Sequence, residues 1–159
     1  MKKNCLLFCF AFVIGIMLLT GCDKKLETTD LSNIYLDNMT IGMKINKDDL
    51  TNYTDSDRYS YDYKYKFEEI VIDTNDDDEI NYLFARFDED YIEIKVNDKS
   101  LKKIEDVQNA LGNNYQNKNY DREQQLKEYV YKDNDKNIKA EFVYSTNDNS
   151  LYWIILSKN

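Results

Sequence analysis

The sequence predicts an α+β domain, in which an antiparallel sheet packs one face against one or two short helices. Aromatic and polar residues alternate strictly from Tyr59 to Phe67, which is the side-chain period of a strand. Apolar residues recur at helical spacing from Leu101 to Leu111, and Gly112 stands where a helix ends. Clusters of Asn and Asp separate the remaining apolar runs, so the strands should pair antiparallel through short turns.

The first half is expected to hold one short helix and four strands. Asn46 is suited to cap the helix, and Leu50 and Tyr53 are spaced to form its buried edge. The strands are expected at 59–67, 69–73, 79–87 and 91–96, with an acidic turn at 74–78.

The second half is expected to hold one longer helix and three strands. Asp98 or Ser100 can cap the helix, and the polar stretch 113–125 that follows it reads as a loop. The strands are expected at 126–132, 138–145 and 151–157. The last strand is apolar on both faces, which favours a central position in the sheet.

The N-terminus has the pattern of a secretory signal. Lys2 and Lys3 precede an uninterrupted apolar run from Cys5 to Leu19, and small residues follow it. A transmembrane helix is the alternative, but the run is shorter than the ~20 residues that a membrane span needs. Residues 1–21 are therefore expected to form a cleaved signal peptide.

The signal closes on Leu-Thr-Gly-Cys at 19–22, which resembles the lipobox of bacterial lipoproteins. The resemblance implies that Cys22 receives a diacylglyceryl group and becomes the first residue of the mature protein. Two acyl chains hold a protein stably in a membrane. The resemblance implies that this is the outer leaflet of the bacterial cytoplasmic membrane, facing the cell wall or periplasm. The polar residues 22–33 then read as a lipidated, flexible tether, and residues 34–159 as a single domain.

Composition removes several kinds of chemistry. The chain has no histidine, the commonest general base and metal ligand. Cys5 and Cys9 leave with the signal and Cys22 is the lipidation site, so the mature part has no thiol nucleophile, disulfide or cysteine metal site. No catalytic residue and no cofactor are expected.

The charge balance indicates what kind of partner the domain can take. The chain has 21 basic and 30 acidic residues, and loss of Lys2 and Lys3 leaves 19 basic residues and a formal charge of −11. Such a surface repels nucleic acid, which needs basic patches. It attracts a protein or a cationic peptide, which is the expected partner besides the membrane.

The helix ending in Leu111-Gly112 and the meander after it resemble half of the β-lactamase-inhibitor-protein fold. The small lipoprotein subunit of the outer-membrane β-barrel assembly machinery is similar to the same unit. The resemblance implies a concave sheet face that binds partners. Gly42, ahead of the first short helix, makes the first half a candidate degenerate copy, with tandem halves at 38–97 and 98–159.

A tyrosine stripe is the strongest functional candidate in the mature domain, because tyrosine is enriched at protein interfaces. The alternative is that these tyrosines are buried against the core, since a strand needs one covered face. The residues expected to form a binding surface, on this strand and on neighbouring ones, are Tyr61, Tyr63, Tyr65, Tyr129, Tyr131 and Trp153.

A weak calcium site is suggested by Asp73, Asn75 and Asp77, whose spacing matches the start of an EF-hand loop. The loop departs from that pattern where it needs glycine and has Asp78, and where it needs a bidentate Glu and has Phe84. A solvated acidic hairpin turn is therefore the favoured interpretation, and no metal is assigned.

These observations predict a membrane-anchored lipoprotein that acts as a non-catalytic binding or accessory module. Two alternatives remain open at this stage. The many carboxylates allow a hydrolase of cell-wall glycans, which would need a pair of carboxylates facing one groove. The acidic turn allows a surface protein that binds calcium weakly.

Overall fold

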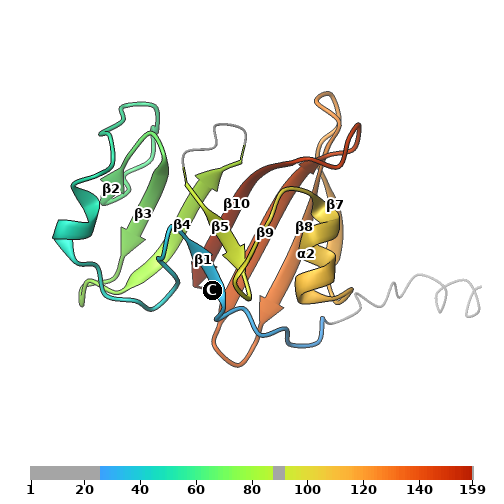
Figure 1. Ribbon diagram of the computed structural model, residues 1–159, viewed down its shortest axis with the longest axis horizontal. Coiled ribbons are helices and arrows are strands. Elements are labelled where there is room, and N and C mark those ends of the chain that lie inside the picture. The colour runs from blue at the N-terminus through green and yellow to red at the C-terminus, as the bar shows by residue number, and fades with distance from the viewer. Residues whose placement is uncertain (1–25, 88–91, 159) are drawn as a thin grey trace, which may run out of the picture.

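The computed structural model describes residues 26–87 and 92–158. Within these ranges the chain forms two antiparallel sheets and one α-helix (Figure 1). The predicted signal peptide and Cys22 lie outside the described residues. No helix in the described part is both long and apolar enough to cross a membrane.

The larger sheet has seven strands, and β10 lies at its centre as its two apolar faces predict. All of its neighbouring strands pair antiparallel. In sheet order, the strands are β2 (Tyr65–Lys66), β3 (Ile70–Thr74), β4 (Ile80–Arg86), β10 (Leu151–Lys158), β9 (Ile138–Ser145), β8 (Leu126–Asp133) and β7 (Gln116–Asp121).

A second layer lies over one face of this sheet, which we call the inner face (Figure 1). The layer consists of the helix α2 (Ile104–Leu111) and a three-stranded sheet. Ile34, Val107 and Phe142 are fully buried in one cluster that joins helix, small sheet and large sheet. The strands of the small sheet, in order, are β1 (Ile34–Leu36), β5 (Ile94–Val96) and β6 (Lys99–Ser100).

The α+β prediction is wrong, because the chain is mostly β, with 46% strand and 9% helix. Asn46 does accept the N–H of Asp48 as a cap, but the helix after it is a single 3-10 turn, Lys47–Leu50. Only Leu50 of this turn is buried, so there is too little apolar surface to stabilise a longer helix. The small sheet covers the face where a second helix was expected.

The predicted tandem repeat is wrong for the same reason. The first half has no α-helix among its described residues, whereas the second half has α2 followed by the meander β7 to β10. That meander has four strands, because part of the expected loop 113–125 forms β7. The strand is exposed at every position except its last, so it has none of the apolar alternation that marks a strand in sequence.

The expected strand over 59–67 is also largely wrong. Only Tyr65 and Lys66 pair with β3, and residue Phe67 forms an isolated bridge with Asp55. The preceding residues instead place the rings of Tyr59 and Tyr63 on β4. The alternation of aromatic residues over 59–67 therefore reflects the packing of rings against the sheet rather than strand pairing within it.

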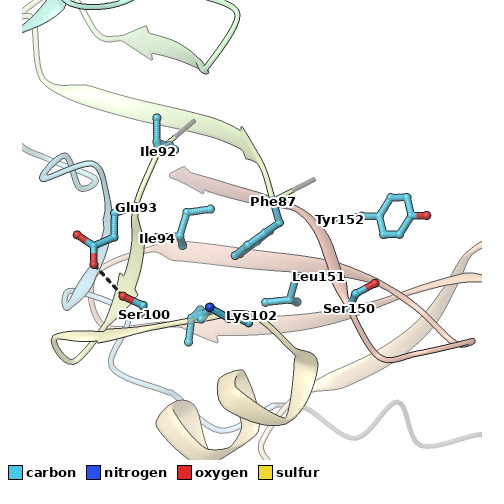
Figure 2. A pocket seen from close by; sticks show the side chains of 10 residues that line it. Phe87, Ile92, Glu93, Ile94, Ser100, Lys102, Ser150, Leu151 and Tyr152 are labelled. Atoms are coloured by element: carbon cyan, nitrogen blue, oxygen red, sulfur yellow. Dashed lines mark hydrogen bonds between the residues drawn. The ribbon is translucent and has the colours of Figure 1, made fainter. Parts of the chain in front are cut away.

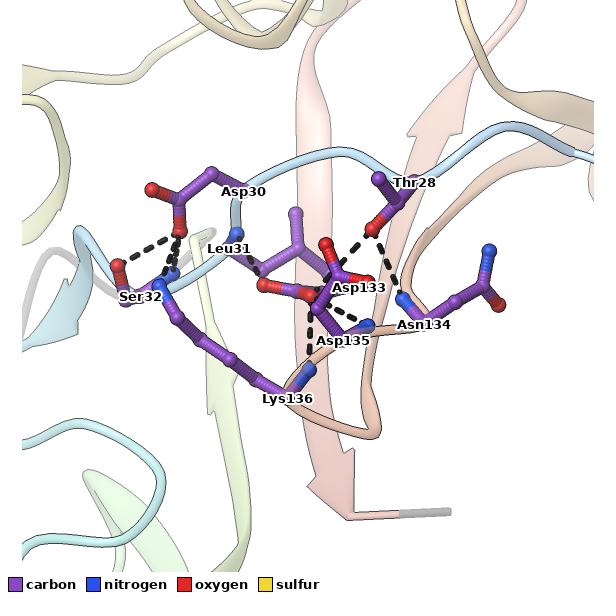
Figure 3. Close-up of polar contacts among 8 residues, drawn as sticks. All are labelled: Thr28, Asp30, Leu31, Ser32, Asp133, Asn134, Asp135 and Lys136. Atoms are coloured by element: carbon purple, nitrogen blue, oxygen red, sulfur yellow. Dashed lines mark hydrogen bonds and ion pairs between the residues drawn. The ribbon is translucent and has the colours of Figure 1, made fainter.

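Residues 26–33 of the expected tether lie against the domain (Figure 3). The N–H of Thr29 donates to the carbonyl oxygen of Lys132 at 2.8 Å. Leu31 belongs to the hydrophobic core. The folded unit accordingly begins before residue 34, because a buried leucine and a backbone hydrogen bond fix this segment.

Candidate functional site

The face of the seven-stranded sheet opposite the small sheet, which we call the outer face, carries an unusual number of aromatic side chains. Side chains alternate along each strand, so β4 turns Leu83 and Ala85 inward and Tyr82 and Phe84 outward. On β10 the same alternation turns Trp153 outward. The two central strands therefore supply both the core and an aromatic surface.

These side chains line a cavity of about 300 Å³, which we call the aromatic groove. Most of its lining is aromatic, and three of the residues precede β2 in a segment that crosses the outer face. The lining residues are Tyr59, Tyr61, Tyr63, Val71, Tyr82, Phe84, Arg86, Tyr120, Trp153 and Ile155.

One wall of the groove is built by the segment before β2. The ring of Tyr59 meets Phe84 edge-on, with centroids 5.8 Å apart. Tyr63 stacks on Tyr82 at 4.9 Å and 14°, and Tyr61 lies beside Tyr63 at 5.9 Å. Tyr61 is 73% exposed, which makes it the outermost ring of this wall.

The other wall is built by Tyr120 of β7, whose ring meets Trp153 of β10 edge-on at 5.2 Å. Strands β8 and β9 lie between β7 and β10, so the two backbones would be ~14 Å apart in a flat sheet. The two side chains therefore lean toward each other over β8 and β9. Together with the segment before β2, they enclose the groove on the outer face.

The residues at the floor of the outer face are buried, although no second sheet or helix among the described residues lies over them. Val71, Val130 and Val143 are buried, and their sheet partners place them on this face. The aromatic rings shield these valines from water and are themselves left partly exposed. Such a surface gains further from contact with an apolar or aromatic-binding partner.

Charges of both signs lie around the groove, and two of the carboxylates are close to Tyr120. Burial and the neighbouring carboxylates Glu128 and Glu141 raise the pKa of Tyr120. Burial and the hydroxyl of Tyr63, 3.4 Å away, raise the pKa of Tyr82 well above its usual value. At neutral pH these phenols are therefore protonated and can donate hydrogen bonds.

Cations also lie on this face. Lys118 pairs with Glu128 at 3.6 Å, and Lys139 pairs with Glu141 at 2.9 Å. Arg86 lines the groove itself. The local field is thus less negative than the overall charge indicates, and the aromatic rings carry the larger part of the contact surface.

The structure brings together three of the six residues expected to form a binding surface, namely Tyr61, Tyr63 and Trp153. Tyr65 lies opposite Ile72 in the sheet and packs against the core on the inner face. It therefore cannot join the groove.

Tyr129 and Tyr131 also lie on the inner face, where they are buried. Tyr115 stacks on Tyr129 at 3.8 Å, and the hydroxyl of Tyr131 donates to the carbonyl oxygen of Gly112 at 2.9 Å. These two tyrosines support the end of α2. Tyr129 and Tyr131 of β8 face the core, whereas Trp153 and Ile155 of β10 face outward, and sequence alone did not separate these two cases.

Four aromatic residues of the groove were missed by the sequence prediction: Tyr59, Tyr82, Phe84 and Tyr120. The alternation of β4 gives a signal for Tyr82 and Phe84, because Leu83 and Ala85 between them are the better core residues. Tyr120 gives none, since its neighbours are all polar.

The residues of the suggested calcium site form the turn between β3 and β4. The side-chain oxygen of Asn75 accepts the N–H groups of Asp77 and Glu79 at 3.0 and 2.9 Å, so it serves the turn itself. Lys64 binds Asp78 at 2.6 Å, which places a cation on the loop. No cluster of metal-ligating side chains occurs within residues 26–87 and 92–158.

A larger cavity, of about 720 Å³, lies between β5, β6 and the start of β10 (Figure 2). Its carboxylate, Glu93, accepts a hydrogen bond from Ser100 at 2.7 Å and pairs with Lys95, and both contacts lower its pKa. Phe87 and Ile92, which line it, bound the stretch 88–91 that the structure does not describe.

Comparison of the chain with protein-family models, with curated proteins and with solved structures found no match. The functional argument consequently rests on the site.

Proposed function

We propose that this chain is a lipid-anchored, extracytoplasmic module that binds a cationic peptide or protein, without catalysis, in the aromatic groove. The observation that carries the proposal is the groove itself: seven aromatic side chains line one cavity on the outer face of the sheet. Tyrosine and tryptophan give large contact areas at a low cost in side-chain entropy. They are also the residues that most often dominate binding energy.

The cationic character of the partner is supported by charge and by ring chemistry. Nineteen basic and 30 acidic residues after residue 21 give a field that draws a cation in. Once there, an ammonium or guanidinium group is attracted to the face of a tyrosine or tryptophan ring. Tyr61 and Tyr120, 73% and 49% exposed, offer such faces at the two walls.

Anchoring is supported by the sequence pattern at residues 1–22. A diacylated Cys22 would hold the domain on the outer face of the cytoplasmic membrane, in the region where a bacterium meets cationic peptides. The hydrolase alternative gains no support from the groove, because none of the described residues that line it is Asp or Glu.

The test is a binding titration of the mature chain with an arginine-rich peptide of about twelve residues, alongside a glutamate-rich peptide of the same length. We expect the arginine-rich peptide to bind and the Y61S/Y63S double variant to bind it at least about tenfold more weakly, in line with the loss of a hot-spot pair. Isothermal titration calorimetry measures both.

Tyr35→Ser is the matched control, because Tyr35 lies on β1 in the small sheet, away from the groove. It should leave the affinity unchanged, and circular dichroism checks that all variants fold. Equal affinity of wild type and Y61S/Y63S would show that the aromatic groove is not the binding site. Equal binding of both peptides would contradict the proposal that the partner is cationic.

A further inference from the structure

The N-terminal segment 26–31 runs across one end of the seven-stranded sheet, where β8 turns into β9 (Figure 3). The carboxylate of Asp133, only 2% exposed, joins the two parts. It accepts the N–H of Leu31 at 3.2 Å and the hydroxyl of Thr28 at 3.4 Å. It also accepts backbone N–H groups of its own turn, including that of Lys136 at 3.0 Å.

Further contacts fix the segment from both sides. The side-chain amide of Asn114, just after α2, donates to the carbonyl oxygen of Glu27 at 2.7 Å and to the hydroxyl of Thr29 at 3.1 Å. On the other side, Lys136 pairs with Asp30 at 2.8 Å. We call segment 26–31 with these partners the N-terminal clamp.

The clamp changes how far the domain can move from an anchor at Cys22. If residues 22–33 were a free tether, its eleven links would span up to ~38 Å. With Leu26 already at the domain, only four links remain, or ~14 Å. The end of the sheet that holds Leu26 must then stay beside the bilayer surface.

We infer that the end of the sheet formed by the clamp and the β8–β9 turn is a membrane-facing surface that holds the domain upright on the lipid headgroups. This inference rests on the lipid anchor of the proposed function. The turn is polar and its exposed residues are Asn134, Asp135, Lys136 and Asn137, which suits contact with hydrated headgroups rather than insertion. The strands extend from this end away from the membrane. The outer face of the sheet, with its aromatic groove, therefore faces sideways, parallel to the membrane surface.

Fluorescence energy transfer to an acceptor on lipid headgroups tests the orientation. Asp135→Cys labels the end at the clamp, and Asn147→Cys labels the opposite β9–β10 turn; both positions are exposed. The labelling is selective, because Cys22 is acylated in the anchored protein and the signal cysteines are removed. The lipidated protein is reconstituted into phosphatidylcholine vesicles.

We expect transfer from position 135 to exceed transfer from position 147 by about threefold or more, since eight-residue strands separate the two ends by ~27 Å. The clamp-breaking variant T28V/D30A/N114A should reduce this difference. A protein with ten Gly-Ser residues inserted after Lys25 and an intact clamp is the matched control, and it should reduce the difference as well.

Equal transfer from both positions in the wild-type protein would overturn the inference, as would an unchanged difference in T28V/D30A/N114A. Failure of the protein to float with vesicles would overturn it together with the proposed anchor. Loss of the orientation while peptide binding persists would leave the groove proposal standing, so the two failures are distinguishable.

Discussion

Tyrosine serves two opposite purposes in this chain, and the face of the large sheet on which the ring lies decides which. Tyr131 is fully buried, and burial raises the pKa of its hydroxyl well above the usual value while the hydroxyl supports the end of α2. Tyr61 projects into solvent at the rim of the groove. The sequence places each in a segment expected to be a strand, and period two identifies a face but not which face is covered.

Asp133 is the residue whose removal should most affect the clamp. Asp133→Asn keeps the shape but replaces one acceptor oxygen by a donor, which then faces N–H groups of the turn and of Leu31. We expect a loss of about 1–3 kcal/mol in the free energy of unfolding, the usual cost of an unsatisfied buried polar group. Urea denaturation of the mature chain measures it.

Asp135→Asn in the same turn is the comparison for that prediction. Its side chain is exposed, so its effect should stay within about 0.5 kcal/mol, as is usual for surface changes. Equal effects of the two substitutions would mean that the buried hydrogen bonds of Asp133 do not stabilise the fold.

Elements with an apolar face could be predicted from the sequence, and elements without one could not. The helix α2 and the strands β3, β4, β8, β9 and β10 each bury alternate or helically spaced apolar residues, and their positions agree with the pattern. Strand β7 buries almost nothing and exists because β8 offers it hydrogen-bond partners. That dependence on a neighbour distant in sequence leaves no local signal.

Packing of α2 is the feature that the helical pattern did predict. Val107 is fully buried between the helix and the sheets. Val107→Ala should lower the free energy of unfolding by roughly 1–3 kcal/mol, because it leaves a cavity under the helix.

Asn109→Ala, on the exposed side of α2, is the control for that substitution. It should be neutral or slightly stabilising, since alanine has the higher helix propensity. Thermal unfolding of both variants compares them, and a larger loss in the Asn109 variant would contradict the packing described for α2.

At the scale of the whole molecule, a seven-stranded sheet covered on one face explains why the fold class was mispredicted. The α+β expectation assigned the covering layer to helices, whereas β1, β5 and β6 provide most of it in runs of two or three residues. Strands β1 and β6 are too short for alternation to be recognised, whereas β5 lies within the strand predicted at 91–96 but was not expected in a separate sheet. The aromatic groove is likewise assembled from segments distant in sequence, so no single segment encodes it.

The net charge makes a prediction that belongs to the whole molecule. If a cationic peptide binds in the groove, its association rate constant should fall roughly tenfold as ionic strength rises from about 0.01 M to about 0.15 M, because screening shortens the reach of the field. Stopped-flow fluorescence of Trp153 can follow the rate. A rate independent of salt would show that the acidic surface has no part in capture.

Strand β7 has one further consequence, which concerns crowding. Strand β7 is the last strand of the large sheet, and no described strand pairs with its free edge. Copies of a protein can stack into fibrils through such an edge. Molecules confined to a bilayer would meet each other far more often than molecules in solution. The lysine at position 118 and the register irregularity between Asn119 and Asp121 oppose edge-to-edge pairing, and would protect the protein from aggregation if it is anchored as proposed.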